Sequence, residues 1–177
     1  MIIALDLDGV IFDFDRGVKE ILGLQYVSLN KSSSEMTKEE KQKKNYLYSK
    51  LAVRGNDFWP YLEFMPGAEE LFQYVSENYK YGILTGYVTS GKQMCIDGKK
   101  AALKSKLNII TNEDNFVCCA SAEKKDYVTY FGTPTVLVDD RIRNVNEFRE
   151  AGGYAILHTN VKQTIQELET LREKLYG

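Results

Sequence analysis

Four aspartates lie close together near the start of the chain, in the segment MIIALDLDGVIFDFD. The apolar run from Ile2 to Leu5 precedes them and is typical of a buried strand in a parallel sheet. Asp6 and Asp8 are two residues apart, so in an extended chain their carboxylates lie on one side, roughly 6–7 Å apart. Because an unpaired carboxylate is costly to bury, this pair indicates a bound cation and a reacting group rather than packing.

Other polar side chains follow later apolar runs of the chain. Thr85 and Gly86 end the run YGILTG, and Asp139 and Asp140 end the run TVLVDD. Two acids at one strand end and two at another can hold a hard divalent ion through oxygen, most naturally Mg²⁺. A hydroxyl group, backbone amides and a lysine can hold the oxygens of an anion. A phosphoryl group bound to Mg²⁺ would satisfy both halves of this set.

The elements that must position these residues alternate along the chain. Strands are expected at 2–5, 81–85, 116–120, 135–139 and 154–158, because each run is short, apolar and bounded by polar or turn residues. Helical patterns are expected from Pro66 onward and at 99–107, 124–131, 141–151 and 161–175. The alternation predicts an α/β fold with a doubly wound, mostly parallel five-stranded sheet, in which the chemistry collects at the carboxyl ends of the strands.

About 75 residues separate the first two expected strands, which is too many for one crossover helix. We therefore expect residues 14–65 to form a small helical cap inserted after strand one, and residues 1–13 and 66–177 to form the core domain. Within the cap, Thr37 and Glu40 predict a capping box at the start of a helix that ends at Arg54. The lysine-rich side of that helix is interpreted as a solvated face.

Composition excludes several classes of protein. The 177 residues carry a formal net charge of −2, with positive and negative side chains interspersed, which gives no sign of electrostatic binding to nucleic acid or to a membrane surface. No apolar stretch is long enough to span a bilayer, and the start of the chain lacks the basic region of a signal peptide. Three cysteines, two of them adjacent, fit reduced thiols and a cytoplasmic location better than a disulfide framework.

Taken together, the motifs resemble those of the haloacid dehalogenase superfamily of phosphohydrolases. That signature has D-x-D-G-[TV] after the first strand, Ser or Thr after the second, Lys near the start of a later helix, and an acidic pair after the fourth. Asp6, Asp8, Thr85, Lys124 and the pair at 139–140 match it in order. A response regulator also uses acids, Thr and Lys, but its phosphoacceptor Asp follows the third strand, and here FVCCA ends without an acid.

The resemblance extends to the 5'(3')-deoxyribonucleotidase-like branch of that superfamily. The segments DGVIFDF, FWPYLEFMPGAEEL, ILTG, AEKKDYV and VLVDDR look like their counterparts in that group. The group uses aromatic side chains to pack on a nucleobase, which implies substrate-binding roles for Phe14, Phe58 and Trp59. The alternative for Phe58 and Trp59 is a place in the core where the cap joins the body.

The resemblance also implies a catalytic mechanism. Asp6 would attack phosphorus to form an aspartyl-phosphate, and Asp8 would first protonate the leaving oxygen and then deprotonate the attacking water. Mg²⁺ would be held by Asp6, the backbone carbonyl of Asp8 and Asp140, while Asp139 would orient this shell or a metal-bound water. The division of roles between Asp139 and Asp140 stays open.

The groups that would stabilise the phosphate include one residue, a lysine, for which the sequence offers three candidates. The resemblance implies that Thr85, the amide of Gly86 and a lysine bind the equatorial oxygens. Lys124 fits the pattern acid-Lys-x-x-aromatic best, whereas Lys125 and Lys99 are rivals at the same and at another helix start.

The expected function is Mg²⁺-dependent hydrolysis of a small phosphomonoester, with a nucleoside monophosphate as the substrate that the resemblance implies. Alternative hypotheses are a terminal phosphatase acting on nucleic acid ends, a phosphatase of small sugar phosphates, and a non-catalytic phosphate-binding module on the same fold. The position of the phosphate, 5' or 3', and the oligomeric state stay open.

Overall fold

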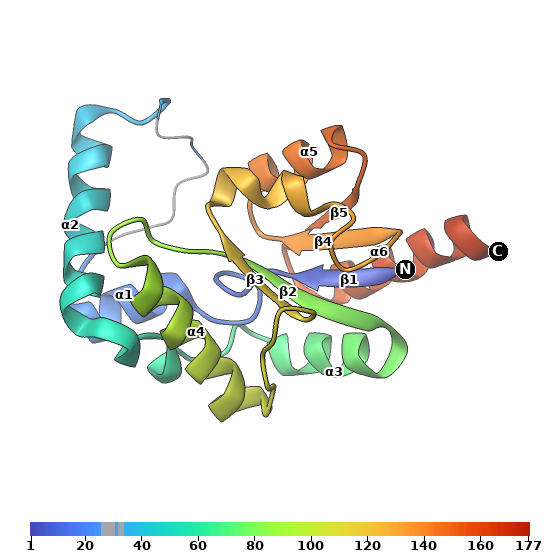
Figure 1. Ribbon diagram of the computed structural model, residues 1–177, viewed down its shortest axis with the longest axis horizontal. Helices are drawn as coiled ribbons and strands as arrows, with labels where there is room; N and C mark the ends of the chain where they lie inside the picture. Colours follow the sequence, from blue (N-terminus) through green and yellow to red (C-terminus); the bar gives the residue numbers. More distant parts are fainter. Residues whose placement is uncertain (26–30, 32–33) are drawn as a thin grey trace. The chain divides into compact units, whose positions relative to one another are not determined.

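The computed structural model describes residues 1–25, 31 and 34–177 (Figure 1). The chain divides into two compact units. The sheet unit comprises Met1–Phe12, Phe64–Gly86 and Glu113–Gly177, and the helical unit comprises Asp13–Glu63 and Tyr87–Asn112. The helical unit thus adds residues 87–112 to the segment expected as a cap, whose limits stay a prediction. Residues 26–30 and 32–33 of that segment lie outside the described residues.

Five strands form one sheet in the order β3-β2-β1-β4-β5, and every neighbouring pair is parallel. Their bounds are Ile2–Leu5 for β1, Lys80–Gly86 for β2, Phe116–Cys119 for β3, Thr135–Asp139 for β4 and Tyr154–Leu157 for β5. Each expected strand is present, and the sheet is wholly rather than mostly parallel. All residues of β4 are buried, as are Ile3, Ala4 and Leu5, which explains why these strands read as continuous apolar runs.

Helices cover both faces of the sheet (Figure 1). On one face α3 (Ala68–Asn78) packs with α6 (Val161–Tyr176), and on the other α5 (Ile142–Glu150) packs with the 3₁₀ segment η3 (Ser121–Tyr127). The sheet unit is therefore doubly wound, as expected. The expected helix at 124–131 is wrong in type, since a 3₁₀ turn ends at Tyr127.

Local contacts explain where the helices of the sheet unit begin and end. The side chain of Asn160 accepts a hydrogen bond from the amide of Gln163 at 2.9 Å and so caps α6. The glycines at 152 and 153 terminate α5, because their amides bond back to the carbonyls of Arg149 and Phe148 at 3.0 Å.

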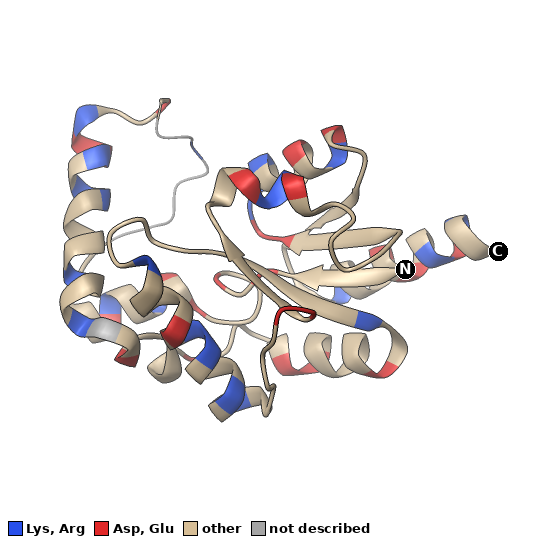
Figure 2. Cartoon of the chain, in the orientation of Figure 1, with Lys and Arg blue, Asp and Glu red and all other residues tan. Residues whose placement is uncertain are grey.

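The helical unit contains α1 (Phe14–Leu22), α2 (Lys38–Arg54) and α4 (Lys92–Leu107), with short 3₁₀ turns at Gly55–Asp57 (η1) and Trp59–Tyr61 (η2). The capping box is confirmed, because the amide of Thr37 donates to Glu40 at 2.7 Å and the amide of Glu40 donates to Thr37 at 3.2 Å. Lys and Arg are spread along α2 (Figure 2). Helix α4 begins at Lys92 rather than at Lys99. Among the described residues, none of the helices combines the length and the hydropathy needed to cross a bilayer.

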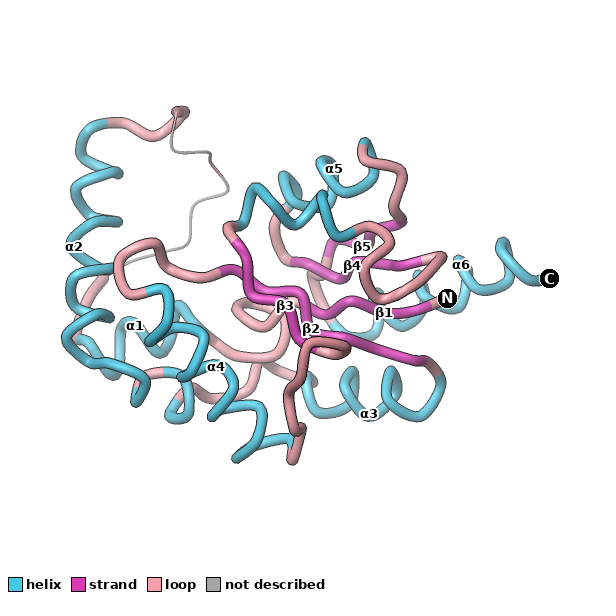
Figure 3. Tube along the Cα trace, viewed as in Figure 1, coloured by secondary structure: helices cyan, strands magenta, loops and turns pink. Residues whose placement is uncertain are grey.

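The register of the central strands decides which residues meet at the edge of the sheet. Leu5 pairs with Ile83 of β2 on one side and with Val138 of β4 on the other. The residues that follow these partners therefore emerge side by side at the carboxyl edge, where the chain passes into loops (Figure 3).

Candidate active site

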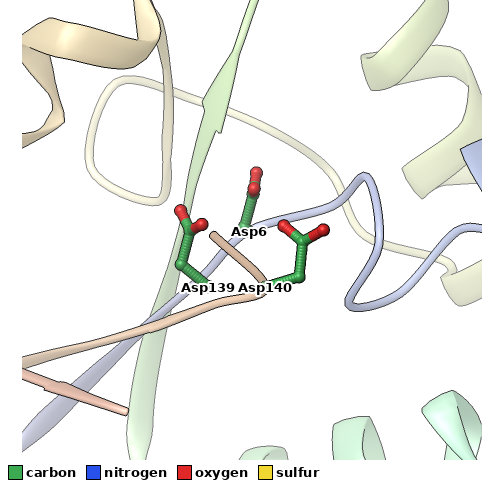
Figure 4. A group of neighbouring side chains, drawn as sticks. All are labelled: Asp6, Asp139 and Asp140. Atoms are coloured by element: carbon green, nitrogen blue, oxygen red, sulfur yellow. The ribbon is translucent and has the colours of Figure 1, made fainter. Parts of the chain in front are cut away.

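Three carboxylates meet where β1 and β4 end (Figure 4). The amide of Asp6 donates to the carbonyl of Val138 at 3.0 Å, so the β1–β4 ladder runs on to the first acid. Each of Asp6, Asp139 and Asp140 offers an oxygen, and these atoms all lie within 4.8 Å of one another. The two motifs, far apart in the sequence, thus form one acidic group at the position expected for them.

Lys124 reaches into this group from η3. Its Nζ lies 2.6 Å from Oδ2 of Asp139 and 2.9 Å from Oδ2 of Asp6, and its side chain is buried. Burial alone would lower the pKa of Lys124, but the charges of Asp139 and Asp6 outweigh it and raise the pKa above its usual value. The ammonium therefore stays charged. Of the rival lysines, Lys125 is exposed, and Lys99 belongs to the helical unit.

Both carboxylate oxygens of Asp139 accept hydrogen bonds from the protein. It is fully buried and accepts from Lys124 Nζ, from the amide of Arg141 at 2.9 Å, and from Nδ2 of Asn144, which lies 3.0 Å from both of its oxygens. Burial raises the pKa of Asp139, and the ammonium of Lys124 opposes that shift. This set of donors suits a group that holds the lysine in place more than a group that binds a metal directly.

Asp140 is in a different situation. Its Oδ1 is buried and has no hydrogen-bond partner among the described residues. Burial, followed by the charges of Asp6 and Asp139, raises the pKa of Asp140 to about 7. A buried carboxylate oxygen beside two other carboxylates is stabilised by a cation, so Asp6 and Asp140 are the residues that fit a divalent ion.

Gly9 makes room for Asp140. Its φ is +82°, and a Cβ atom built at this position would lie 2.3 Å from Oδ2 of Asp140. A side chain at position 9 would therefore both strain the backbone and displace the carboxylate. The glycine of the D-x-D-G motif is thus required by the acid at the end of β4 as well as by the turn.

Asp8 lies in a tight turn after β1. The amides of Ile11 and Phe12 both donate to the carbonyl of Leu7 at 2.8 Å, and an isolated bridge pairs Asp8 with Phe12. Asp8 is not part of the three-carboxylate group, which fits an expected role through its carbonyl and as an acid–base residue. That role stays a prediction.

Thr85 and Gly86 end β2, the other neighbour of β1. Thr85 is fully buried, and a Cβ built on Gly86 would lie 3.9 Å from the side chain of Ser121, the first residue of η3. A hydroxyl and an amide therefore stand at the same edge of the sheet as Asp6, where an anion would need them.

Two polar residues beside this site, Asn144 and Ser121, were not expected from the sequence to take part in it. Asn144, in the first turn of α5, is buried and holds Asp139, while its own Oδ1 accepts a hydrogen bond from Oγ of Ser121 at 3.1 Å. The position of Asn144 in the sequence was the one signal for this role. A residue four positions after Asp140 points back toward the acid pair when a helix starts between them.

The aromatic residues expected at the substrate, Phe14, Phe58 and Trp59, form a cluster within the helical unit. The ring centroids of Phe14 and Phe58 are 5.6 Å apart, and those of Phe58 and Trp59 are 5.2 Å apart, both in edge-on contacts. Phe58 and Trp59 are fully buried, which favours the alternative that they are core residues. A contact with substrate stays a prediction for all three.

Comparisons with known proteins bear on the fold. The sequence matches no family model, and no curated protein matches it. The structure is similar to a haloacid dehalogenase-like family hydrolase from Streptococcus pneumoniae, with a TM-score of 0.54 and 15% identity over 87% of this chain and 82% of that one. The likeness shows that the two chains share a fold, which here is the α/β arrangement around the five-stranded parallel sheet.

Other solved structures resemble the chain less closely. A hydrolase from Pseudomonas syringae matches with a TM-score of 0.45 and 20% identity over 88% of this chain and 82% of that one. The HAD-hydrolase YfnB from Bacillus subtilis, in a magnesium-bound crystal form, matches with a TM-score of 0.47 and 12% identity over 99% and 98% of the two chains.

Proposed function

We propose that the protein is a Mg²⁺-dependent phosphomonoester hydrolase that works through an aspartyl-phosphate and acts on a nucleoside monophosphate. One observation carries the proposal: Asp6, Asp140 and the Asp139–Lys124 pair meet at the carboxyl edge of the sheet, the edge at which β2 ends with Thr85 and Gly86. A cation site next to fixed anion-binding groups is what a phosphate ester needs.

In the first step, a carboxylate oxygen of Asp6 forms a bond to phosphorus while the bond from phosphorus to the ester oxygen breaks. The amide of Leu7 holds Oδ1 of Asp6 at 2.8 Å and Lys124 holds Oδ2 at 2.9 Å, so the plane of the nucleophile is fixed before substrate binds. Asp8 gives its proton to the departing oxygen, which leaves as an alcohol.

In the second step, water attacks the phosphorus of the aspartyl-phosphate. Asp8, now ionised, takes the proton of that water, the bond between phosphorus and Asp6 breaks, and inorganic phosphate leaves. Lys124 remains charged through both steps and, with Thr85 and the amide of Gly86, stabilises the negative charge on the non-bridging oxygens.

A divalent ion at Asp6 and Asp140 would offset the repulsion between the nucleophile and the phosphate. The residues present fit such an ion, because Oδ1 of Asp140 is buried beside the carboxylate of Asp6 and has no hydrogen-bond partner in the described part of the chain. Asp139, already held by Lys124 and Asn144, would keep the lysine in position.

The test is hydrolysis of para-nitrophenyl phosphate by the wild type and by Asp6→Asn. We expect the substitution to abolish turnover, EDTA to stop the wild type, and Mg²⁺ to restore it. Asp126→Asn, which makes the same change at an exposed position of the sheet unit, should keep full activity. Full activity in Asp6→Asn would refute the proposal. A panel of nucleoside monophosphates and sugar phosphates then tests the substrate class.

A further inference from the structure

The overall charge of −2 conceals a strong partition of charge between the two units. Residues 13–63 and 87–112 carry 14 Lys and Arg against 9 Asp and Glu, a net charge of +5. The remaining residues carry 9 Lys and Arg against 16 Asp and Glu, a net charge of −7. The helical unit is therefore a basic body in an acidic protein, and α2 carries much of its positive charge (Figure 2).

Basic and aromatic residues alternate along one side of α2. Lys43, Tyr46, Lys50 and Arg54 follow the spacing of a helix face, and Tyr61 of η2 adjoins Arg54. We call these five residues the basic–aromatic stripe. All five are exposed; Tyr46 and Tyr61 are 54% and 65% accessible. By the helical rise, Lys43 and Arg54 are about 17 Å apart along the axis, a distance that several nucleotides of a single strand can span.

Each exposed ring of the stripe is paired with a cation. Nζ of Lys50 lies 5.2 Å from the ring centroid of Tyr46, and Cζ of Arg54 lies 5.9 Å from that of Tyr61. Among the described residues, the other two cation–π pairs, Lys44–Tyr48 and Lys92–Tyr87, also belong to the helical unit. The stripe therefore presents positive charges beside flat apolar surfaces.

The acidic groups near the stripe leave its charge largely intact. Glu39 bonds Lys43 at 2.9 Å, but both side chains are well exposed, at 76% and 65%, and such surface pairs exchange readily with other ions. Glu40 is held by Lys31 and by the amide of Thr37, within the capping box. Asp57, in η1, is the remaining acid between α2 and η2.

This combination selects one kind of partner. Exposed lysines alone fit a solvated helix face, whereas the two large exposed rings beside them add flat apolar surface to the positive charge. A partner helix would need a continuous apolar stripe, whereas the exposed side of α2 carries Tyr46 and Val53 among Lys and Arg. Single-stranded nucleic acid satisfies both features, because phosphates pair with Lys and Arg while unpaired bases stack on aromatic rings.

We propose that the basic–aromatic stripe binds single-stranded nucleic acid, with Lys43, Lys50 and Arg54 on phosphates and Tyr46 and Tyr61 under bases. This inference does not depend on the proposed phosphatase activity, and its test measures binding alone.

The first experiment is fluorescence anisotropy with a labelled oligothymidylate and the full chain. Three phosphate contacts predict a slope near −2 for the logarithm of the association constant against the logarithm of salt concentration, or about an 18-fold loss of affinity from 50 to 200 mM salt. Lys43→Gln/Lys50→Gln/Arg54→Gln should lower the affinity and bring the slope close to zero. The matched control, Lys162→Gln/Arg172→Gln/Lys174→Gln on α6, removes the same charge from exposed positions of the sheet unit and should bind as the wild type does.

The second experiment isolates stacking. Tyr46→Ala/Tyr61→Ala should weaken binding to oligothymidylate by at least about fivefold per ring, yet leave binding to an abasic oligomer of equal charge unchanged. Equal binding of the two oligomers by the wild type would overturn the proposal. So would equal loss in the control on α6, or stronger binding to polyglutamate or to vesicles of anionic phospholipid.

Discussion

Gly9→Ala is the substitution that probes the acidic group most directly. The change adds one methyl group and removes no polar atom, so it alters neither the charge nor the donor set of the site. The added Cβ would lie 2.3 Å from Oδ2 and 2.6 Å from Cγ of Asp140, whereas ordinary contacts begin near 3.4 Å. The carboxylate of Asp140 must therefore retreat by about 1 Å, as the difference between those distances shows.

The substitution has two separate effects, one on the backbone and one on the carboxylate of Asp140. A side chain at φ +82° costs about 1–2 kcal/mol of backbone strain, which corresponds to a fall in Tm of about 2–8 °C for a chain of this length. Displacement of the Asp140 carboxylate should weaken Mg²⁺ binding about 10- to 100-fold, which is the usual cost of removing a group that orients a metal ligand. A misplacement of about 1 Å among reacting groups also lowers turnover by about 100-fold.

Gly152→Ala separates the two effects. Gly152 has φ +92° and belongs to the same unit, but a Cβ there would have no neighbour within 4 Å among the residues that the structure describes. Both variants should therefore lose similar stability, and only Gly9→Ala should lose Mg²⁺ affinity, measured by calorimetric titration of each purified variant beside its thermal unfolding curve. If both variants bind Mg²⁺ as tightly as the wild type does, Asp140 is not a ligand and the reasoning fails.

Two further predictions concern buried groups of the sheet unit. Asn144→Leu should lower the free energy of unfolding, measured by urea denaturation, by about 1–3 kcal/mol, because both oxygens of Asp139 lose a donor. Ser121→Ala removes only the hydrogen bond from Ser121 to Asn144 and should lower it by about 1 kcal/mol or less. Equal losses of stability in the two variants would contradict this account. Burial raises the pKa of Cys119 to about 11, so iodoacetamide at pH 8 should label it only after unfolding, as read by peptide mass spectrometry; rapid labelling of the folded protein would contradict the burial of this thiol.

The strands and the acidic group could be predicted from sequence because their signals are local. A parallel strand buried on both faces is a short apolar run, and Asp6 and Asp139 each stand at the end of one. The parallel topology then brings these ends together. Asn144 could not be predicted with the same ease, because its role depends on the turn from which α5 starts.

Two helix predictions failed because contacts from distant residues override the local pattern. The helix expected at 99–107 begins at Lys92 instead, and α4 runs through Gly98, where a Cβ would lie 2.6 Å from the ring of Trp59. The segment after Ser121 forms a 3₁₀ turn in which Lys124 pairs with Asp6 and Asp139, and neither partner is near it in the sequence.

The place of β1 in the middle of the sheet has a consequence for how the protein is made. Ile2 pairs with Lys80 on one side and with Thr135 on the other, so both flanking partners are synthesised long after β1 itself. Such non-local pairing slows folding and leaves an apolar strand without neighbours on the ribosome. A nascent chain therefore cannot bring its three carboxylates together until Asp140 has emerged.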